Sequence, residues 1–407
     1  MTQSGSVPRS ASNRHWGFST AGRVFFGWGV LDELRNVGQE LGKRALICTD
    51  RNIIKSGIAE RVEFLLKEGG AEVLVFPEGR PEIDIKTISD AVEAARQFKP
   101  DVIVGVGGGS NMDLGKCAAI LLRYPGPLQT YYGENAVPGP VVNLIGIPTT
   151  SGTGSEVSPV AVVADPDRFM KVGIASRLIT PKWALVDPSL TVSCPPHVTA
   201  HSGMDALSHA IESFCARIPT DRSPRAIFVG KNPISDSLAK QAIQLIARSL
   251  AKAVSEPGNK EAREDMALAS LSAGMAFSNA GTAAVHALQY PVGEATHTSH
   301  GLGNAVLMPA VLQAILKSRI PELAFIARAL DSSLNQAGDD EAARQAPELV
   351  ARLGDSVQIP RGLHAIGMKR EQLNEMAELA SGIKRLLDNS PVEFDQAALL
   401  NILEEAY

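Results

Sequence analysis

The feature that most constrains the fold is the alternation of short apolar runs with helical patterns between Arg44 and Pro188. The apolar runs read RALICTD, AEVLVFP and DVIVGVGGGS, and helical patterns near Ile58–Glu68 and Ile85–Phe98 separate them. Such alternation predicts βαβ units around a parallel sheet. Further strand-like runs follow, with Gly and Pro at the breaks: VVNLIGIPTT, SPVAVVADP, FMKVGIAS and WALVDPS.

The pattern changes after Pro195 and Pro196, where the strand-like runs stop. Long segments such as SDSLAKQAIQLIARSLAKAV then carry apolar residues at spacings of three and four, which is typical of amphipathic helices. These observations predict a flexible tail at residues 1–14, an α/β domain at 15–193 and a helical domain at 194–407. Two packed domains leave a cleft between them, and such clefts are common ligand sites.

Composition argues against two classes of partner. The 39 basic and 44 acidic residues give a formal net charge of -5, so nothing favours a polyanionic partner such as nucleic acid. No apolar run approaches the roughly 20 residues that cross a bilayer, so no membrane span is expected.

The 4 cysteines form no Cys-x-x-Cys pair, which suits reduced thiols and a cytoplasmic protein. A transit peptide in the Ser- and Arg-rich N-terminus is the alternative.

A glycine-rich segment, GVGGGSNMDLGK, follows the third strand-like run and opens a helical pattern. Its glycines let backbone N–H groups approach a phosphate at a helix N-terminus, which predicts a pyrophosphate site. It lacks the third glycine of the G-x-G-x-x-G pattern. It also departs from a P-loop at Ser110 and Cys117, which disfavours ATP hydrolysis. A tight turn without a ligand is the alternative.

Two further features suit a dinucleotide. The segment PTTSGTGSE, at residues 148–156, is a second polar turn at the end of a strand-like run. Asp50 closes the run RALICTD, where a carboxylate can accept hydrogen bonds from an adenine-ribose diol and would repel a 2′-phosphate. This favours NAD over NADP. An aspartate that caps a helix is the alternative reading of Asp50.

Histidines and one aspartate suggest a metal site. Asp205 and His209 are four residues apart in a helical pattern, so their side chains share one face, about 5 to 6 Å apart. His286 and His300 lie in HALQYPVGEATHTSH, where Pro291 and a following glycine are expected to turn the chain back. One carboxylate and three imidazoles form a plausible site for iron or zinc. A surface ion pair and hydrogen-bonded structural histidines are the alternatives.

These segments together closely resemble the iron-containing alcohol dehydrogenase family, also called group III. The resemblance runs from about Val24 to the C-terminus and rests on four motifs in order: GGGSNMDLGK, IPTTSGTGSE, GMDALSHAIESF and HALQYPVGEATHTSHGLGNAVLMP. It implies an N-terminal Rossmann-like dinucleotide-binding α/β domain, an all-α C-terminal domain and a metal in the cleft between them, which is the dehydroquinate synthase-like fold.

The resemblance also assigns site residues. By motif position the metal ligands are Asp205, His209, His286 and His300, with Fe(II) as the expected ion and Zn(II) as the alternative. The expected cofactor-binding residues are Asp50, Gly108, Gly109, Ser110, Asn111, Thr149, Thr150 and Lys171.

Two positions depart from the family pattern. Where many members carry a second histidine four residues after His286, this chain has Tyr290, so Tyr290 or His297 is expected to relay the proton. Where many members read Asn-Pro-Thr, this chain reads Arg-Pro-Glu, which places Arg80 near the nicotinamide end. An anionic group on the substrate is one explanation of Arg80, and a solvated loop arginine is the other.

The implied activity is NAD-linked hydride transfer between a small alcohol and its aldehyde or ketone, with the metal acting as a Lewis acid. The resemblance also implies a homodimer or larger homo-oligomer. The alternatives are a zinc-type glycerol dehydrogenase, a dehydroquinate synthase-like lyase and a metal-binding relative without catalytic activity. No cluster of basic residues near the histidines favours the lyase.

Overall fold

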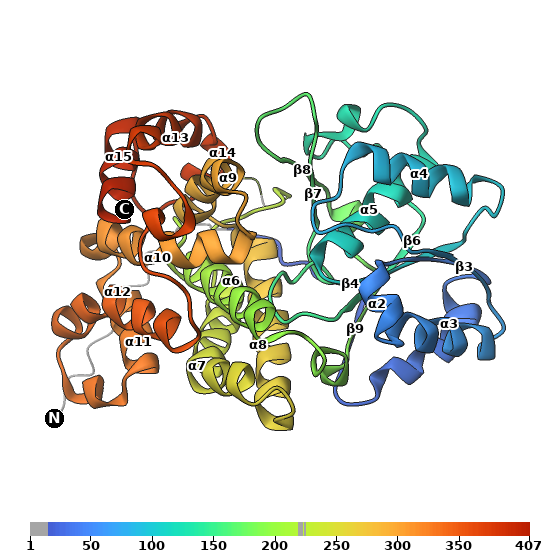
Figure 1. Cartoon of the computed structure of the whole chain (residues 1–407), viewed down its shortest axis with the longest axis horizontal. Helices are drawn as coiled ribbons and strands as arrows, with labels where there is room; N and C mark the ends of the chain where they lie inside the picture. The colour runs from blue at the N-terminus through green and yellow to red at the C-terminus, as the bar shows by residue number, and fades with distance from the viewer. Residues whose placement is uncertain (1–14, 219–222, 224) are drawn as a thin grey trace, which may run out of the picture.

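The computed structural model of the protein describes residues 15–218, 223 and 225–407. The flexible tail predicted at residues 1–14 lies outside them. An α/β part is followed by a helical part, as the fold class predicted (Figure 1). The last turn of the α/β part is a 3-10 helix at Pro188–Thr191, and the first long helix begins at Pro196. The domain boundary after residue 193 stays a prediction.

Six parallel strands form the main sheet, in the order β1-β9-β6-β4-β2-β3. Strand β4 is buried along its whole length, because helices cover both faces of the sheet. The strands are β1 Arg23–Phe26, β2 Arg44–Cys48, β3 Glu72–Phe76, β4 Val102–Gly107, β6 Asn143–Pro148 and β9 Trp183–Val186.

Side chains of the sheet alternate between two cores, because successive residues of a strand point to opposite faces. Leu46 and Ile103 pack on the face that α4 and α5 cover, whereas Ile47 and Val104 pack on the face that α3 covers (Figure 1). The helices of this part are α1 Val37–Glu40, α2 Arg51–Lys55, α3 Ile58–Glu68, α4 Ile85–Arg96 and α5 Gly109–Arg123.

Two of the predicted strands leave the main sheet and form a small one. Strand β7 (Val160–Val163) pairs antiparallel with β8 (Val172–Ala175), and β8 pairs with β5 (Gly133–Glu134). Buried residues of β7 and β8 share a core with α5. Lys171 directly precedes β8 instead of lying within it. The small sheet therefore carries Lys171 toward the carboxyl ends of the main strands.

The helical part has one large core that is rich in Ala, Leu and Ile. Helix α6 lies within it, and most of its residues from Thr199 onward are buried. The helices are α6 Pro196–Cys215, α7 Pro233–Ser255, α8 Lys260–Ala280, α9 Ala284–Thr296, α10 His300–Ile315, α11 Ile320–Leu330, α12 Asp339–Ser356, α13 Leu373–Ser381, α14 Lys384–Leu387 and α15 Gln396–Glu405.

The predicted turn at Pro291 and Gly293 is wrong. Helix α9 continues through Pro291 to Thr296, and the chain turns at His297, whose φ of 54° lies in the left-handed region. A proline inside a helix removes one backbone hydrogen bond. Pro291 is buried, however, and packing of α9 in the helical core offsets that loss. Tyr290 therefore lies one helical turn after His286 on the same helix.

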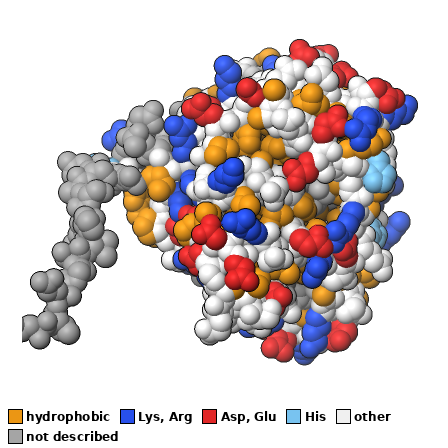
Figure 2. Space-filling model, turned by 90° about the vertical axis from the view of Figure 1, so that its left-hand side faces the viewer, with side chains coloured by type: hydrophobic (Ala, Val, Ile, Leu, Met, Phe, Trp, Pro, Cys, Tyr) orange, Lys and Arg blue, Asp and Glu red, His pale blue; other side chains and the backbone are white. Residues whose placement is uncertain are grey.

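The face of the helical part carries acidic and basic side chains interspersed, without a broad field of one sign (Figure 2). This agrees with the nearly balanced charge count. Among the described residues, no helix combines the length and low polarity that crossing a bilayer requires.

Candidate metal and cofactor site

Helix α6 supplies two of the four predicted metal ligands. Asp205 and His209 are separated by one helical turn, so both side chains emerge from the same face. Both residues are buried, with exposed fractions of 3% and 5%. Helix α10 passes close to this face of α6 at Gly301. A Cβ atom at Gly301 would lie 2.1 Å from the His201 carbonyl oxygen and 3.0 Å from Asp205 Cβ, so the close approach of the two helices requires glycine there.

The other two predicted ligands come from α9 and α10. His286 is buried in the first turn of α9, and His300 is the first residue of α10. The turn at His297 reverses the chain between the two helices. As a result the ligand atoms of Asp205, His209, His286 and His300 all lie within 4.8 Å of one another. A carboxylate oxygen and three imidazole nitrogens at that spacing fit a single divalent ion.

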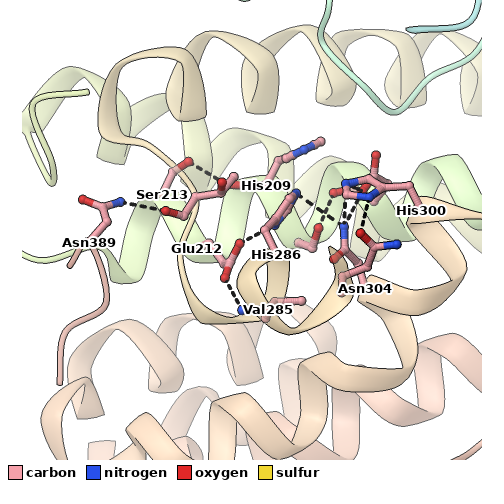
Figure 3. A network of polar contacts seen from close by, with 12 residues as sticks. His209, Glu212, Ser213, Val285, His286, His300, Asn304 and Asn389 are labelled. Carbon is pink, nitrogen blue, oxygen red and sulfur yellow. Dashed lines mark hydrogen bonds and ion pairs between the residues drawn. The ribbon is translucent and has the colours of Figure 1, made fainter. Parts of the chain in front are cut away.

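The second ring nitrogen of each histidine is already engaged. His286 Nδ1 donates to Glu212 Oε2 at 2.5 Å, and Glu212 Oε1 accepts the Val285 backbone N–H (Figure 3). His209 Nδ1 lies 3.3 Å from the Gly152 carbonyl oxygen, and His300 Nδ1 lies 2.6 Å from Gln289 Oε1. These partners leave Nε2 of each ring for the centre of the cluster. Such outer contacts orient metal-binding imidazoles and raise their basicity.

The pKa values of Asp205, His209 and His300 are shifted toward the protonation states that bind a metal. Burial lowers the pKa of His209, and the neighbouring His286 lowers it further, while Asp205 opposes both effects. Burial also lowers the pKa of His300. For Asp205, burial raises the pKa, but the three imidazoles and Asn304 bring it below its usual value. Neutral imidazoles beside an ionised carboxylate are what a divalent cation requires.

Asn304 lies in the middle of the ligand set (Figure 3). Its Nδ2 donates to Asp205 Oδ1 at 2.8 Å and lies 3.2 Å from His300 Nε2 and 3.4 Å from His286 Nε2. Its Oδ1 is buried without a hydrogen-bond partner among the described residues. Asn304, Glu212 and Gln289 were not among the residues predicted from the sequence. Helical spacing was the available signal, since Asn304 follows His300 by four residues and Glu212 follows His209 by three.

Apart from Lys171, the predicted cofactor residues lie along the carboxyl ends of three neighbouring strands, β2, β4 and β6. Helix α5 begins without a side-chain cap, so its first N–H groups are available to a ligand. A Cβ atom at Gly108 would meet only Thr150 Oγ1, at 3.9 Å, so the backbone there borders open space. A Cβ atom at Gly109 would lie 2.9 Å from Thr153. Both positions fit a turn that a pyrophosphate can approach.

Asp50 and Asn111 are linked to each other. Asp50 caps α2 by accepting the backbone N–H groups of Asn52 and Ile53, as the alternative reading supposed. Its second oxygen accepts a 2.7 Å hydrogen bond from Asn111 Nδ2, which also donates to the Val106 carbonyl. Asn111 is buried, so it positions Asp50 from within the protein. Asp50 is half-buried and keeps a carboxylate at the strand end.

The remaining predicted cofactor residues lie around these turns. Thr149 is buried, and its backbone N–H donates to the Gly107 carbonyl, whereas Thr150 is partly exposed. Ser110 Oγ donates to the Pro81 carbonyl, and Lys171 Nζ donates to Glu82. Ser110, Glu82 and Lys171 line a shared cavity, which connects the cofactor turns to the histidine cluster.

That cavity has a volume of about 200 Å³. His286, His300 and Tyr290 line it together with Phe228 and Arg385. Burial raises the pKa of Tyr290, so its phenol keeps its proton at neutral pH. The rings of Tyr290 and His300 are 6.1 Å apart.

The second candidate for proton relay, His297, and the predicted substrate residue, Arg80, lie outside the cavity lining. His297 is exposed at the end of α9, and Arg80 is exposed and pairs with Asp84 at 3.6 Å. Their parts in proton relay and anion recognition stay predictions. Arg385 was missed, because its sequence neighbours carry no recognisable motif.

Comparisons with known proteins agree with this arrangement. Sequence profiles of "Iron-containing alcohol dehydrogenase" match residues 21–188, and profiles of "Fe-containing alcohol dehydrogenase family, C-terminal" match residues 199–407. The chain is 39% identical to long-chain-alcohol dehydrogenase 1 of Geobacillus thermodenitrificans, over 94% of each protein.

Two solved structures are similar as well. A crystal structure of 1,3-propanediol oxidoreductase matches with a TM-score of 0.91 and 33% identity, covering 97% of this chain and 100% of that one. Sulfoacetaldehyde reductase from Bifidobacterium kashiwanohense, solved in complex with NAD+, matches with a TM-score of 0.83 and 28% identity, covering 97% and 99%.

Proposed function

The chain is an oxidoreductase that belongs to the iron-containing alcohol dehydrogenase family, and we propose that it interconverts a small alcohol and its aldehyde or ketone with NAD as hydride carrier. One observation carries the proposal. The four-residue ligand cluster and the glycine turn at the start of α5 border the same cavity. A substrate in that cavity could touch a metal and a nicotinamide at once.

Asp205, His209, His286 and His300 would hold the metal, which when bound acts as a Lewis acid toward the substrate oxygen. Glu212, Gln289 and the Gly152 carbonyl fix the three imidazole rings. Phe277 stacks on His209 with ring centroids 4.3 Å apart and helps to keep water from that side of the cluster.

NAD would lie across the carboxyl ends of β2, β4 and β6 and carry the hydride. The first turn of α5 would donate N–H groups to the pyrophosphate, and Ser110 would flank it. Asp50 presents a carboxylate that Asn111 and the start of α2 hold in place. A negative charge there favours a ribose diol over a 2′-phosphate, which supports NAD as the cofactor.

For the released proton we propose Tyr290 as the relay. Tyr290 lines the cavity with its ring 6.1 Å from that of His300, and its raised pKa keeps the Oη proton in place until a base is available. His297 is exposed at the end of the same helix and stays the second candidate.

The proposal includes a cytoplasmic protein that forms a homodimer or a larger homo-oligomer, supported by the family resemblance. Light scattering during size-exclusion chromatography tests the assembly. A mass of one 43.1 kDa chain would contradict it.

The function is tested with the purified protein loaded with Fe(II) or Zn(II). NAD with a panel of alcohols, and NADH with a panel of aldehydes and ketones, are followed by the absorbance of the reduced nicotinamide. We expect turnover that a chelator abolishes and that added metal restores. Absence of turnover with either metal and every substrate would favour a relative without catalytic activity.

A further inference from the structure

We infer that the preferred substrate of this cavity carries an anionic group, a carboxylate or a sulfonate, and that Arg385 binds it. The inference rests on the proposed function and narrows its substrate class. Arg385 would bind the end of the substrate that is remote from the reacting carbon.

Arg385, in the short helix α14, lines the cavity, as does Phe228. The guanidinium of Arg385 lies over the ring of Phe228, with Cζ 5.2 Å from the ring centroid. Stacking on an aromatic ring fixes the plane of a guanidinium while leaving its edge N–H groups available. A planar fork of donors binds a carboxylate or sulfonate through two hydrogen bonds.

The nearest charge partner of Arg385 among the described residues is weakly placed. Glu134 Oε1 lies 3.9 Å from Arg385 Nε, which is beyond hydrogen-bonding distance. Both side chains are more than one third exposed, at 37% and 34%. An ion pair of this kind contributes little and can yield to a ligand.

The other charged groups of the cavity already have closer partners. Lys171 donates to Glu82, and Asp113 accepts a 2.7 Å hydrogen bond from Ser155 and a 3.0 Å bond from the Val162 backbone. Asp205 belongs to the ligand cluster. Arg385 is therefore the cavity cation whose donors are most available to a substrate.

A second hollow of about 430 Å³ opens beside the cavity and shares Val160, Lys171, Tyr290 and Arg385 with it. Its charged lining consists of Arg168, Lys171, Arg385 and Glu134. Because Lys171 is paired with Glu82, Arg168 and Arg385 against Glu134 give this approach a positive bias, which raises the local concentration of anions. The positive charge of the outer hollow would therefore attract the same anionic substrates that Arg385 is inferred to bind.

The two ends of the cavity define the substrate. The histidine cluster requires a carbonyl or hydroxyl oxygen at one end, and Arg385 requires an anion at the other. A short-chain molecule that carries both groups fits a cavity of about 200 Å³. The reaction stays that of the proposed function: the aldehyde takes a hydride from NADH and a proton from solvent to give the alcohol and NAD+.

The test compares substrates of equal length with and without charge. Succinic semialdehyde is paired with butanal, and sulfoacetaldehyde with propanal, to separate the carboxylate from the sulfonate. For the wild type we expect kcat/KM at least about tenfold higher for one charged member than for its neutral partner, because hydrogen bonds to a charged group are strong. In Arg385→Gln that ratio should fall by about tenfold or more, and Arg385→Lys should recover part of it.

Arg168→Gln is the matched control, since Arg168 lines the outer hollow but not the cavity. Long-range attraction is screened at about 0.5 M salt, whereas a direct contact persists. At that salt concentration the charged-to-neutral ratio should match the wild type in Arg168→Gln and stay reduced in Arg385→Gln. Equal ratios in the wild type and Arg385→Gln would overturn the inference.

A binding measurement separates this inference from the proposed function. Calorimetry with the metal-loaded protein compares γ-hydroxybutyrate with butanol and requires no turnover. Tighter binding of the hydroxy acid that Arg385→Gln abolishes supports the anion site even if no hydride transfer is found. Equal affinities of the wild type for the two ligands would exclude the anion site.

Discussion

Glu212 Oε2 lies 2.5 Å from Nδ1 of His286, and both residues are buried in the helical part. The carboxylate accepts a hydrogen bond from the Nδ1–H group, which fixes the tautomer of His286 and leaves its Nε2 for a metal. The contact ties a residue that sequence reasoning overlooked to one that it identified. It also makes the quality of the metal site depend on a group that touches neither metal nor substrate.

The first prediction concerns this contact. Glu212→Gln keeps the shape of the side chain but removes its charge, so His286 becomes a weaker ligand. We expect the affinity for Fe(II) or Zn(II) to fall about 10- to 100-fold, as is usual when an outer partner of a ligand is lost. Competition with a chromogenic chelator measures it. The exposed Glu375→Gln in α13 is the control, and equal metal affinity in both variants would refute the role of Glu212.

The second prediction concerns cofactor choice. Asp50→Asn keeps a side-chain oxygen for the α2 cap but removes the negative charge. We expect kcat/KM with NADP to rise relative to NAD, while thermal stability changes little. Asp50→Ala should in addition cost about 1 kcal/mol of stability through the lost cap. If the NADP-to-NAD ratio is the same in the wild type and Asp50→Asn, Asp50 does not select the cofactor.

The third prediction assigns the proton relay. Tyr290→Phe removes the hydroxyl while keeping the ring in the cavity. We expect kcat for alcohol oxidation to fall about 10- to 100-fold, the lower part of the usual range for general acid–base catalysis, with a changed pH profile. His297→Ala, directly after the same helix and outside the cavity lining, should change the profile less. The reverse ranking would move the relay to His297, and unchanged profiles in both would exclude both residues.

The fourth prediction concerns the metal-free protein at low pH. Burial lowers the pKa of His209 below the usual 6.5. Just below pH 6.5, His209 is therefore protonated in the unfolded chain but still neutral in the folded chain. The free energy of unfolding should therefore be constant above that pH and decrease below it, by at most about 1.4 kcal/mol per pH unit for this one group. Urea unfolding between neutral and acidic pH measures it. In His209→Asn the slope should be smaller, and an unchanged slope would contradict the account.

Local sequence pattern predicted most strands of the main sheet and the helical part, and the glycine-rich segment lies where β4 ends and α5 begins. The spacing of Asp205 and His209 predicted a shared helical face, and α6 confirms it. Pro291 was misread because a buried proline within α9 looks like a chain breaker when only the sequence is considered. Strand β1 was missed because its four residues, RVFF, are short and lie at an edge of the sheet.

Tertiary contacts determine the rest of the site. Arg80 was predicted to recognise an anionic substrate group because it departs from a family motif, yet it lies exposed beside Asp84. Arg385 alters no motif that the sequence analysis considered, and only the packing of α14 near α9 brings it to the cavity with Tyr290. A sequence without structure shows which residues share a helix but not which distant helix supplies the opposite wall.

Metal titration of the stripped protein tests the central claim most directly. The claim is that Asp205, His209, His286 and His300 hold the one divalent ion on which NAD-linked hydride transfer depends. We predict that NADH oxidation with an aldehyde rises in proportion to added Fe(II) or Zn(II) and saturates at about one equivalent per chain, and that His209→Ala and His286→Ala neither bind this equivalent nor turn over. Full activity in the stripped protein, or stoichiometric metal binding that survives both substitutions, would contradict the account.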